Sequence, residues 1–340
     1  MKWRLVLWPF AVVYDLVTKV RNHLFDIGHK PSFEFEIPVI SVGNLNIGGS
    51  GKTPMIEYLI RLLSPTHRIA TLSRGYGRKT RGLRFAGNDD DASTIGDEPF
   101  QMFRKFGPDV KVVVGEDRAF AIPNLLNEFP DVDVVLLDDA FQHRSVRPRF
   151  SILLSEYEHI FTKDFLLPAG NLREARSGAH RADAVIVTKC PSQVDDEVQL
   201  IDTIRRYVGP KPVFLSSLRY GQPVSFGSPS VMGERIVLLT GIANPEPLVS
   251  FLGGSNIVER HFRFGDHHRY NRMEVEEIID FAGMRQAAIV TTEKDMVRLL
   301  NQSCEDVVHK FPFFYIPIQA VFLKNGSEFD ELVRRKLTAD

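Results

Sequence analysis

The sequence contains only two cysteines, Cys190 and Cys304, and no long hydrophobic run. Two thiols cannot build the disulfide framework of a small secreted domain or a cysteine-rich zinc finger, and their scarcity favours a reducing compartment. The apolar run Leu5–Tyr14 is interrupted by Pro9 and is about half as long as the ~20 residues of a membrane-spanning helix. Because no small-residue cleavage site follows this run, we expect no export signal.

The chain also lacks an excess of charge of either sign. Its 42 Lys and Arg residues oppose 43 Asp and Glu residues, for a net charge of −1. The sequence therefore lacks the basic field that holds nucleic acid non-specifically, and we expect no nucleic-acid partner. Hydrophobic residues make up 44% of the 340 positions, which is enough for a large core and predicts two domains.

The first 30 residues differ from the rest in charge. They carry five Lys and Arg residues against two Asp residues, a net charge of +3, together with Trp3, Trp8, Phe10 and Tyr14. This composition is typical of an amphipathic helix that lies in the interface of an anionic membrane. The same periodicity also fits a helix docked on its own domain.

Several short, continuously apolar runs predict buried strands, and most are separated by helical patterns. This alternation predicts an α/β fold with helices layered on a mainly parallel sheet. The predicted strands are Ile37–Val42, Val110–Val114, Val132–Leu137, Ala184–Val187, Ile236–Leu239 and Ala288–Val290.

A Ser, Gly and Pro-rich stretch, Ser216–Ser230, predicts the boundary between the two domains. We therefore expect an interfacial helix region at 1–30, a nucleotide-binding domain at 31–215 and a smaller α/β domain at 216–322. Pro312–Phe322 is predicted to return the chain to the first domain, which the C-terminal helix at 323–340 completes.

The first predicted strand leads into a glycine-rich loop and then into an amphipathic helix. The loop residues that would bind nucleotide phosphates are Gly48, Gly49, Ser50, Gly51, Lys52 and Thr53. Glycines allow successive N–H groups to face phosphate oxygens, Lys52 would reach the β- and γ-phosphates, and Thr53 would bind Mg²⁺. Asn46 stands where the general pattern has its first glycine, and Gly48 and Gly49 are expected to supply the turn.

Two acidic residues, Asp138 and Asp139, follow the strand Val132–Leu137. In open parallel sheets the ligand crevice lies at the carboxyl ends of the strands, so these carboxylates predict a Mg²⁺ site. The alternative is that they only cap the following turn.

Asp97 begins a predicted helix in the segment Gly96-Asp97-Glu98-Pro99. Its position favours a role as the helix N-cap. A phosphotransferase also needs a general base for its acceptor hydroxyl, and Asp97 could serve with His267 of the segment Asp266-His267-His268 beside it.

Polar residues in three further loops are candidates for binding an anionic substrate. They are Arg74, Gln142, His143 and Arg173. A guanidinium can hold a phosphate bidentately. The alternative is that these cations lie in solvated surface loops and bind no substrate.

Taken together, these motifs resemble the tetraacyldisaccharide 4'-kinase family, the lipid A 4'-kinases of Gram-negative bacteria, over nearly the whole chain. The resemblance rests on several segments in the same order: Ser41–Pro54, Ser73–Gly77, Gly96–Pro99, Asp138–Arg144, Pro168–Glu174, Asp266–His268 and Thr292–Asp295. It implies two α/β/α sandwich domains joined by a two-stranded linker, with the lipid headgroup in the cleft.

The resemblance further implies ATP-dependent phosphorylation of the 4'-hydroxyl of an acylated glucosamine disaccharide 1-phosphate at the cytoplasmic face of the inner membrane. By this similarity Lys52 and Thr53 serve ATP and Mg²⁺, Asp138 and Asp139 serve the metal, and Asp97 is the base beside His267. A lipid substrate would also explain a peripheral, membrane-bound N-terminal helix, and an anionic sugar would give Arg74 and Arg173 a target.

Two other functions compete with this one. A nucleotide-dependent switch or chaperone-type ATPase has similar glycine-doubled loops, although Thr188–Pro191 lacks the Asp of a guanine-reading element. A lipid-binding protein that uses the N-terminal helix alone would not need Lys52.

Overall fold

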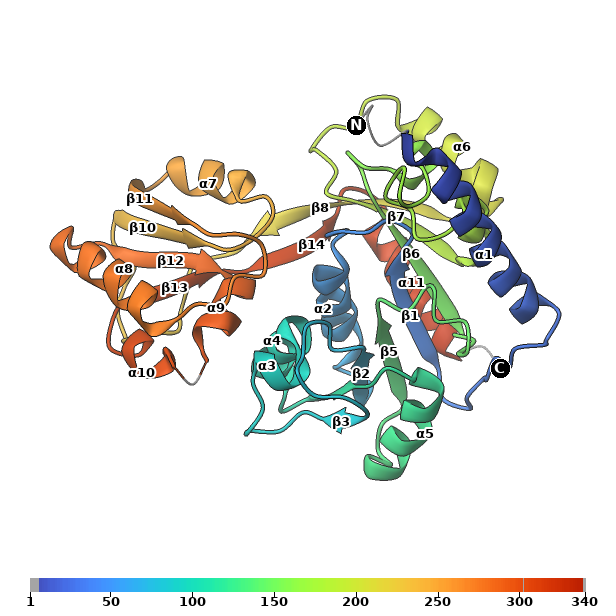
Figure 1. Cartoon of the computed structure of the whole chain (residues 1–340), viewed down its shortest axis with the longest axis horizontal. Helices are drawn as coiled ribbons and strands as arrows, with labels where there is room; N and C mark the ends of the chain where they lie inside the picture. Colours follow the sequence, from blue (N-terminus) through green and yellow to red (C-terminus); the bar gives the residue numbers. More distant parts are fainter. Residues whose placement is uncertain (1–5, 302, 339–340) are drawn as a thin grey trace.

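The computed structural model describes residues 6–301 and 303–338, which form two β-sheets flanked by helices (Figure 1). Lys2, Trp3 and Arg4 of the predicted interfacial region lie outside the described residues.

The larger sheet contains nine strands in the order β14-β8-β7-β6-β1-β5-β2-β4-β3. Its pairs from β8 to β4 are parallel, whereas β14 and β3 pair antiparallel at the two edges. The strands are β1 Val39–Asn44, β2 Ile69–Ser73, β3 Arg84–Phe85, β4 Val110–Val114, β5 Val134–Asp138, β6 Phe150–Glu156, β7 Ala184–Thr188, β8 Val213–Tyr220 and β14 Ile318–Phe322.

Alternate residues of the central strands face opposite sides of this sheet, and both sides are buried. In β5, Val134 and Leu136 pack toward one core, whereas Val135 and Leu137 pack toward another. This two-sided burial explains why the central strands read as continuous apolar runs in the sequence. Helices α2 and α11 cover the first face, and α5 and α6 cover the second.

The helices of this part of the chain follow the strand–helix alternation. They are α1 Trp8–Asp26, α2 Lys52–Leu63, α3 Ala92–Ile95, α4 Asp97–Phe106, α5 Arg118–Glu128, α6 Glu197–Val208 and α11 Gly326–Thr338, with short 3₁₀ turns at Phe161–Lys163 and Arg176–Arg181. No helix in the described ranges is long and apolar enough to cross a bilayer.

The smaller sheet has the order β11-β10-β12-β13-β9, and only its edge strand β9 is antiparallel. Helix α7 packs on one face, and α8 and α9 pack on the other. The elements are β9 Val224–Ser225, β10 Arg235–Thr240, α7 Glu246–Gly253, β11 Ile257–Arg263, α8 Arg272–Met284, β12 Ala288–Thr292, α9 Glu293–Leu299, α10 Glu305–Val308 and β13 Phe313–Ile316.

Two antiparallel strands, β8 and β14, run from the larger sheet to the smaller one (Figure 1). Pro312–Phe322 is therefore only partly the connector predicted from the sequence. Pro317 separates β13, a strand of the smaller sheet, from β14, which pairs with β8. The α/β fold class and the two-stranded linker are confirmed, and the exact domain boundaries at residues 215 and 322 stay a prediction.

Helix α1 lies along the outside of the larger sheet (Figure 1). Polar side chains attach it to the fold. The Tyr14 hydroxyl donates to the Arg173 carbonyl at 2.8 Å, and the Asn22 amide donates to Glu174 at 2.9 Å. Its other side is apolar and exposed, with Val13 61% and Val17 60% accessible. The helix is thus docked on its own fold and still presents an apolar surface to solvent.

Candidate active site

The glycine-rich loop connects β1 to α2 at the carboxyl edge of the larger sheet. Gly48 and Gly51 have φ angles of 113° and 80°, which lie in the region that favours glycine. The Thr188 hydroxyl, at the end of β7, donates to the Ser50 carbonyl at 2.9 Å and so holds the loop in place. The predicted strand, glycine turn and helix N-terminus therefore occur in the order that a phosphate-binding loop requires.

Asn46, the departure from the general loop pattern, has a structural role. Its amide donates to Asp164 Oδ2 at 2.9 Å, and its carbonyl accepts from the Asn44 amide at 2.6 Å. Asn46 is 8% exposed and does not adopt a positive φ. This position therefore does not need glycine, and its side chain ties the loop to the segment around Asp164.

Lys52 begins α2 and points toward the ends of two neighbouring strands. Its ammonium lies 3.2 Å from Asn44 Oδ1 and 3.6 Å from Asp139 Oδ1, and the side chain is 17% exposed. Thr53 follows in the first turn of the same helix. A partly buried cation at a helix N-terminus beside a glycine turn is an arrangement that stabilises phosphate oxygens.

Asp138 is the last residue of β5, which pairs directly with β1, and Asp139 follows it. Asp139 adopts a left-handed conformation with φ 51°, and both of its oxygens lie 3.0 Å from the Arg173 guanidinium. Burial raises the pKa of Asp138 to about 7, the Lys52 charge opposes the rise, and Asp139 and Glu98 add to it. Asp138 Oδ1 is buried without a hydrogen-bond partner.

The orphaned oxygen of Asp138 fits a bound cation, because a buried carboxylate oxygen without a donor is costly unless a positive charge reaches it. In residues 6–301 and 303–338, no group of three or more His, Cys, Asp or Glu side chains gathers as a metal site. A Mg²⁺ ion here would therefore take ligands from Asp138 or Asp139, the Thr53 hydroxyl and the phosphates of a bound nucleotide. This mixed ligand set is usual for Mg²⁺ at nucleotide sites.

The raised pKa of Asp138 predicts a pH-dependent stability. A carboxyl with a pKa near 4 unfolded and about 7 folded stabilises the fold fully below pH 4, and this stabilisation is lost as the pH rises through 7. The loss amounts to about 4 kcal/mol at about 1.4 kcal/mol per pKa unit. Asp138→Asn should therefore raise the melting temperature of the nucleotide- and metal-free protein, with a gain that widens from pH 5 to pH 8.

Thermal unfolding in EDTA at several pH values checks this prediction. Asp139→Asn is the matched control, because it removes a carboxylate of the same turn that is already paired with Arg173. The gain should widen much more for Asp138→Asn, because Asp139→Asn removes only the contribution of the Asp139 charge to the raised pKa of Asp138. A melting-temperature gain for Asp138→Asn that is the same at every pH would contradict the assignment.

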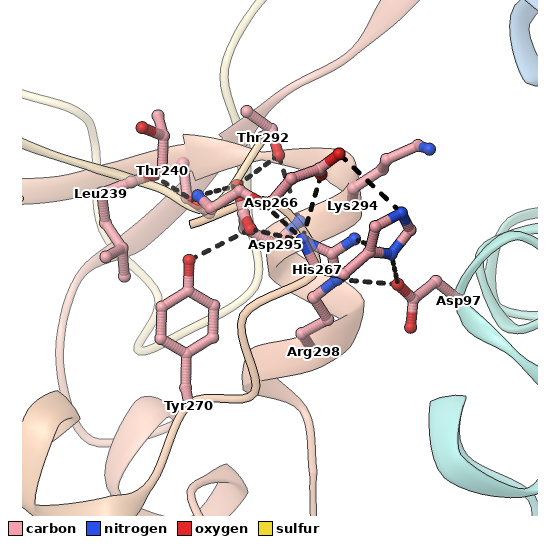
Figure 2. Close-up of polar contacts among 12 residues, drawn as sticks. Asp97, Leu239, Thr240, Asp266, His267, Tyr270, Thr292, Lys294, Asp295 and Arg298 are labelled. Atoms are coloured by element: carbon pink, nitrogen blue, oxygen red, sulfur yellow. Dashed lines mark hydrogen bonds and ion pairs between the residues drawn. The ribbon is translucent and has the colours of Figure 1, made fainter. Parts of the chain in front are cut away.

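Asp97 at the start of α4 and His267 in the loop between β11 and α8 meet in the structure (Figure 2). The carboxylate oxygen Oδ2 of Asp97 lies 3.3 Å from His267 Nδ1 and 2.8 Å from Arg298 Nε. Gly96, not Asp97, is the N-cap of α4, and no side chain caps this helix. The capping interpretation of Asp97 was therefore wrong, because its side chain is directed to the smaller sheet.

The start of α4 is fixed by close packing against the loop after β2. A methyl group on Gly96 would lie 2.9 Å from the Tyr76 carbonyl oxygen, and one on Gly75 would lie 2.7 Å from the Ile95 carbonyl oxygen. His267 has φ 59° and its ring packs edge-on against Tyr76, with centroids 6.0 Å apart. A left-handed non-glycine residue held in this way is typical of functional sites.

Glu98 interacts electrostatically with Asp138 and with His267. Its charge contributes to the raised pKa of Asp138. Burial acts to raise the pKa of Glu98, but Lys294, the hydrogen bonds at Glu98 and the charge of His267 lower it overall. The same carboxylate thus interacts electrostatically with both halves of the predicted site.

The four predicted substrate-binding residues lie in different environments. Arg74 is exposed on the loop after β2. Gln142 donates to the Asn44 carbonyl and to Glu174, and Arg173 is paired with Asp139.

His143 is held within the chain as an acceptor. Its Nε2 lies 3.2 Å from the Arg118 amide and 2.8 Å from the Ser145 hydroxyl. Burial, followed by the charge of Arg118, lowers the pKa of His143 to about 4. Its ring is therefore neutral at physiological pH.

Several residues of this region were not predicted from the sequence. Glu174 is 3% exposed and accepts hydrogen bonds from Asn22, Gln142 and Arg181. Arg298 binds Asp97 although it lies about 200 residues away. The only available signal was the acidic and basic segment Thr292–Arg298 on a short helix, to which we assigned no role.

A family model described as Tetraacyldisaccharide-1-P 4'-kinase matches residues 3–338. The chain belongs to this family. The match runs through every segment on which the resemblance rested, from the glycine-rich loop to Thr292–Asp295.

Relatives of similar length carry the corresponding name. A tetraacyldisaccharide 4'-kinase of Flavobacterium johnsoniae is 43% identical over 96% of this chain and 95% of that protein. One of Bacteroides thetaiotaomicron is 42% identical over 96% of this chain and 90% of that protein. The crystal structure of the family member LpxK from Aquifex aeolicus in complex with ATP superposes with a TM-score of 0.78 at 30% identity, covering 98% and 99% of the two chains.

Proposed function

We propose that this chain transfers the γ-phosphoryl group of ATP to the 4'-hydroxyl of an acylated glucosamine disaccharide 1-phosphate, a lipid A precursor. The observation that carries the proposal is the meeting of two groups in one fold. A phosphate-binding loop with Lys52 lies at the carboxyl edge of the larger sheet, and Asp97 at the start of α4 lies 3.3 Å from His267.

The loop amides and Lys52 bind and orient the triphosphate, because they place partial and full positive charge where the γ-phosphate carries its negative charge. Asp138, Asp139 and Thr53 hold Mg²⁺, which neutralises charge on the phosphates when bound. Arg173 fixes Asp139 through both carboxylate oxygens, so that this side chain enters the reaction already oriented.

Asp97 acts as the general base. Its carboxylate takes the proton as the O–H bond of the sugar hydroxyl breaks, the hydroxyl oxygen bonds to the γ-phosphorus, and the bond to the β-phosphate oxygen breaks to release ADP. His267 lies beside Asp97, with Nδ1 3.3 Å from Oδ2 of this carboxylate.

The anionic headgroup meets Arg74, which is exposed and available for a bidentate contact. Gln142, His143 and Arg173 line the same region and, through their bonds within the chain, shape the loops that receive the sugar. These four residues are thus proposed to act as one substrate surface.

The exposed apolar side of α1 binds the membrane that holds the lipid substrate. We place the enzyme at the cytoplasmic face of the inner membrane as a peripheral protein. Its docking contacts through Tyr14 and Asn22 leave the apolar side free, so the helix can lie in the lipid interface without leaving the fold.

Polar substitutions on this surface should weaken membrane binding. The double variant Val13→Asn, Val17→Asn is expected to reduce partitioning onto anionic phospholipid vesicles by at least about tenfold, because burying each valine contributes about 1.5 kcal/mol or more. Co-sedimentation with vesicles measures this.

The matched control is Val198→Asn, Val231→Asn, which changes two valines outside α1 that are even more exposed, at 75% and 93%. It should bind vesicles as the wild type does. If the α1 double variant bound vesicles as well as the control double variant, α1 would be excluded as the membrane-binding surface.

The transferase proposal is tested by incubating the purified protein with γ-labelled ATP, Mg²⁺ and the acylated disaccharide 1-phosphate in detergent. We expect label on the lipid, and fragmentation by mass spectrometry should place the new phosphate on the non-reducing sugar. Release of label only as inorganic phosphate, stimulated by a protein partner, would instead support a nucleotide-dependent ATPase.

A further inference from the structure

Arg298 of α9 is buried in the smaller domain and directed at Asp97 in the larger one (Figure 2). Its side chain is 3% exposed, and Nη1 donates to the Gly241 carbonyl at 2.8 Å and to Asp295 at 3.2 Å. Nε donates to Asp97 Oδ2 at 2.8 Å. A planar guanidinium held on one edge in this way presents its remaining donors in a fixed direction.

The support behind Arg298 is itself fully buried. Asp295 is 0% exposed and accepts from the Gly241 amide at 3.0 Å, the Tyr270 hydroxyl at 3.0 Å and the Thr292 hydroxyl at 2.7 Å. A buried carboxylate with this many donors is held rigidly in one orientation. Arg298 therefore has a preorganised anchor, and Asp97 receives the free side of the guanidinium.

Arg298 also determines the hydrogen bonding of His267. Its Nη2 lies 3.1 Å from His267 Nδ1, and because arginine has only donors, Nδ1 must accept. The ring proton then lies on Nε2, on the side of Asp266 at 3.9 Å. In this arrangement Nδ1 has no proton to give to Asp97 Oδ2, although the two atoms are 3.3 Å apart.

We propose that Arg298 is a positioning residue for the transfer reaction: it fixes the Asp97 carboxylate through Oδ2 and holds His267 as the Nε2–H tautomer. Among the described residues, Arg298 donates to Oδ2 of Asp97 and His267 Nδ1 lies 3.3 Å from the same oxygen, which leaves Oδ1 for the acceptor hydroxyl. This inference rests on the proposed function for its kinetic consequences, but the tautomer it assigns does not.

The charged and titratable groups facing Asp97 come from three segments. His267 and Asp266 lie on the loop before α8, Arg298 lies on α9, and Glu98 follows Asp97 on α4, where Lys294 of α9 neutralises it at 2.8 Å. Arg298 is the only one of these cations in direct contact with the Asp97 carboxylate among the described residues. Its removal should therefore act first on the position of this carboxylate.

Arg298→Met should lower kcat about 10- to 100-fold and leave the KM for ATP within about twofold, because the base is misoriented and nucleotide binding is untouched. Arg298→Lys keeps the charge without the fork, so it should restore only part of kcat.

The matched control is Lys294→Met, which removes the neighbouring ion pair between the same two helices, α4 and α9. It should leave kcat close to the wild-type value. A kcat that falls equally in both variants would mean that loss of any contact between these helices causes the effect, and would overturn the assignment to Arg298.

Long-range ¹H–¹⁵N spectra of labelled protein provide the second readout, with the His267 signals assigned from His267→Gln. We expect the Nε2–H tautomer in the wild type and the Nδ1–H tautomer in Arg298→Met, since Nδ1 is then free to donate to Asp97. An Nδ1–H tautomer already present in the wild type would overturn the proposal, even if Arg298→Met does not fold. A wild-type protein without transferase activity would contradict the proposed function alone, because the tautomer result still decides the role of Arg298.

Discussion

Asp97→Asn is expected to lower kcat by at least about 100-fold while the Kd for ATP stays within about twofold. The substitution removes the base, and lost acid–base assistance costs about 10²- to 10⁴-fold. Asparagine keeps an oxygen for Arg298, whereas Asp97→Ala would leave a nearly buried guanidinium without its partner and add a stability defect. Steady-state kinetics with the lipid acceptor, together with calorimetric ATP binding, measure the two effects separately.

His267→Gln tests the second residue of the Asp97–His267 contact. It should also lower kcat with little effect on ATP binding, because Nδ1 lies 3.3 Å from the Asp97 carboxylate and not on the nucleotide side.

Unchanged turnover in Asp97→Asn would remove the base assignment. A large loss of ATP affinity in the same variant would instead place Asp97 at the nucleotide.

Lys52→Ala is expected to lower kcat/KM by about 10²- to 10³-fold. The ammonium is 17% exposed and lies between Asn44 and Asp139, so its charge acts in a partly desolvated site where it stabilises developing negative charge strongly. The measurement is the initial rate of label transfer at several ATP concentrations.

Lys324→Ala is the matched control, because Lys324 forms an exposed ion pair with Glu197. It should retain wild-type rates, since such surface pairs contribute little. Full activity of Lys52→Ala would be the result expected of a lipid-binding protein that uses α1 alone, and it would exclude the phosphate-loop mechanism.

Local patterns predicted much of the fold because burial on both faces leaves a clear signal. The runs Val110–Val114 and Ala184–Val187 coincide with or nearly match β4 and β7. Strand β6 was missed because Ser151 and Ser155 interrupt its apolar run, although both serines are buried in the sheet. The exposed residues of β11 hid that strand in the same way, because it is an edge strand.

The same distinction between local and long-range information applies to the candidate site. The glycine-rich loop and Asp138-Asp139 could be recognised as candidates because each motif is contained in a short stretch of sequence. The contacts of Arg298 and Glu174 could not, since each depends on how loops and helices far apart in the chain pack. Asp97 shows the difficulty most clearly, because its local sequence favours a cap and only the packing of α9 against α4 directs it elsewhere.

The most direct test of the account compares two acceptors with the wild-type enzyme: the acylated disaccharide 1-phosphate and its 4'-deoxy analogue, each with γ-labelled ATP and Mg²⁺. The account predicts label on the natural acceptor, none on the analogue, and no faster release of inorganic phosphate with either. Label appearing on the 4'-deoxy compound at a comparable rate, or on neither lipid while ATP is hydrolysed, would contradict it.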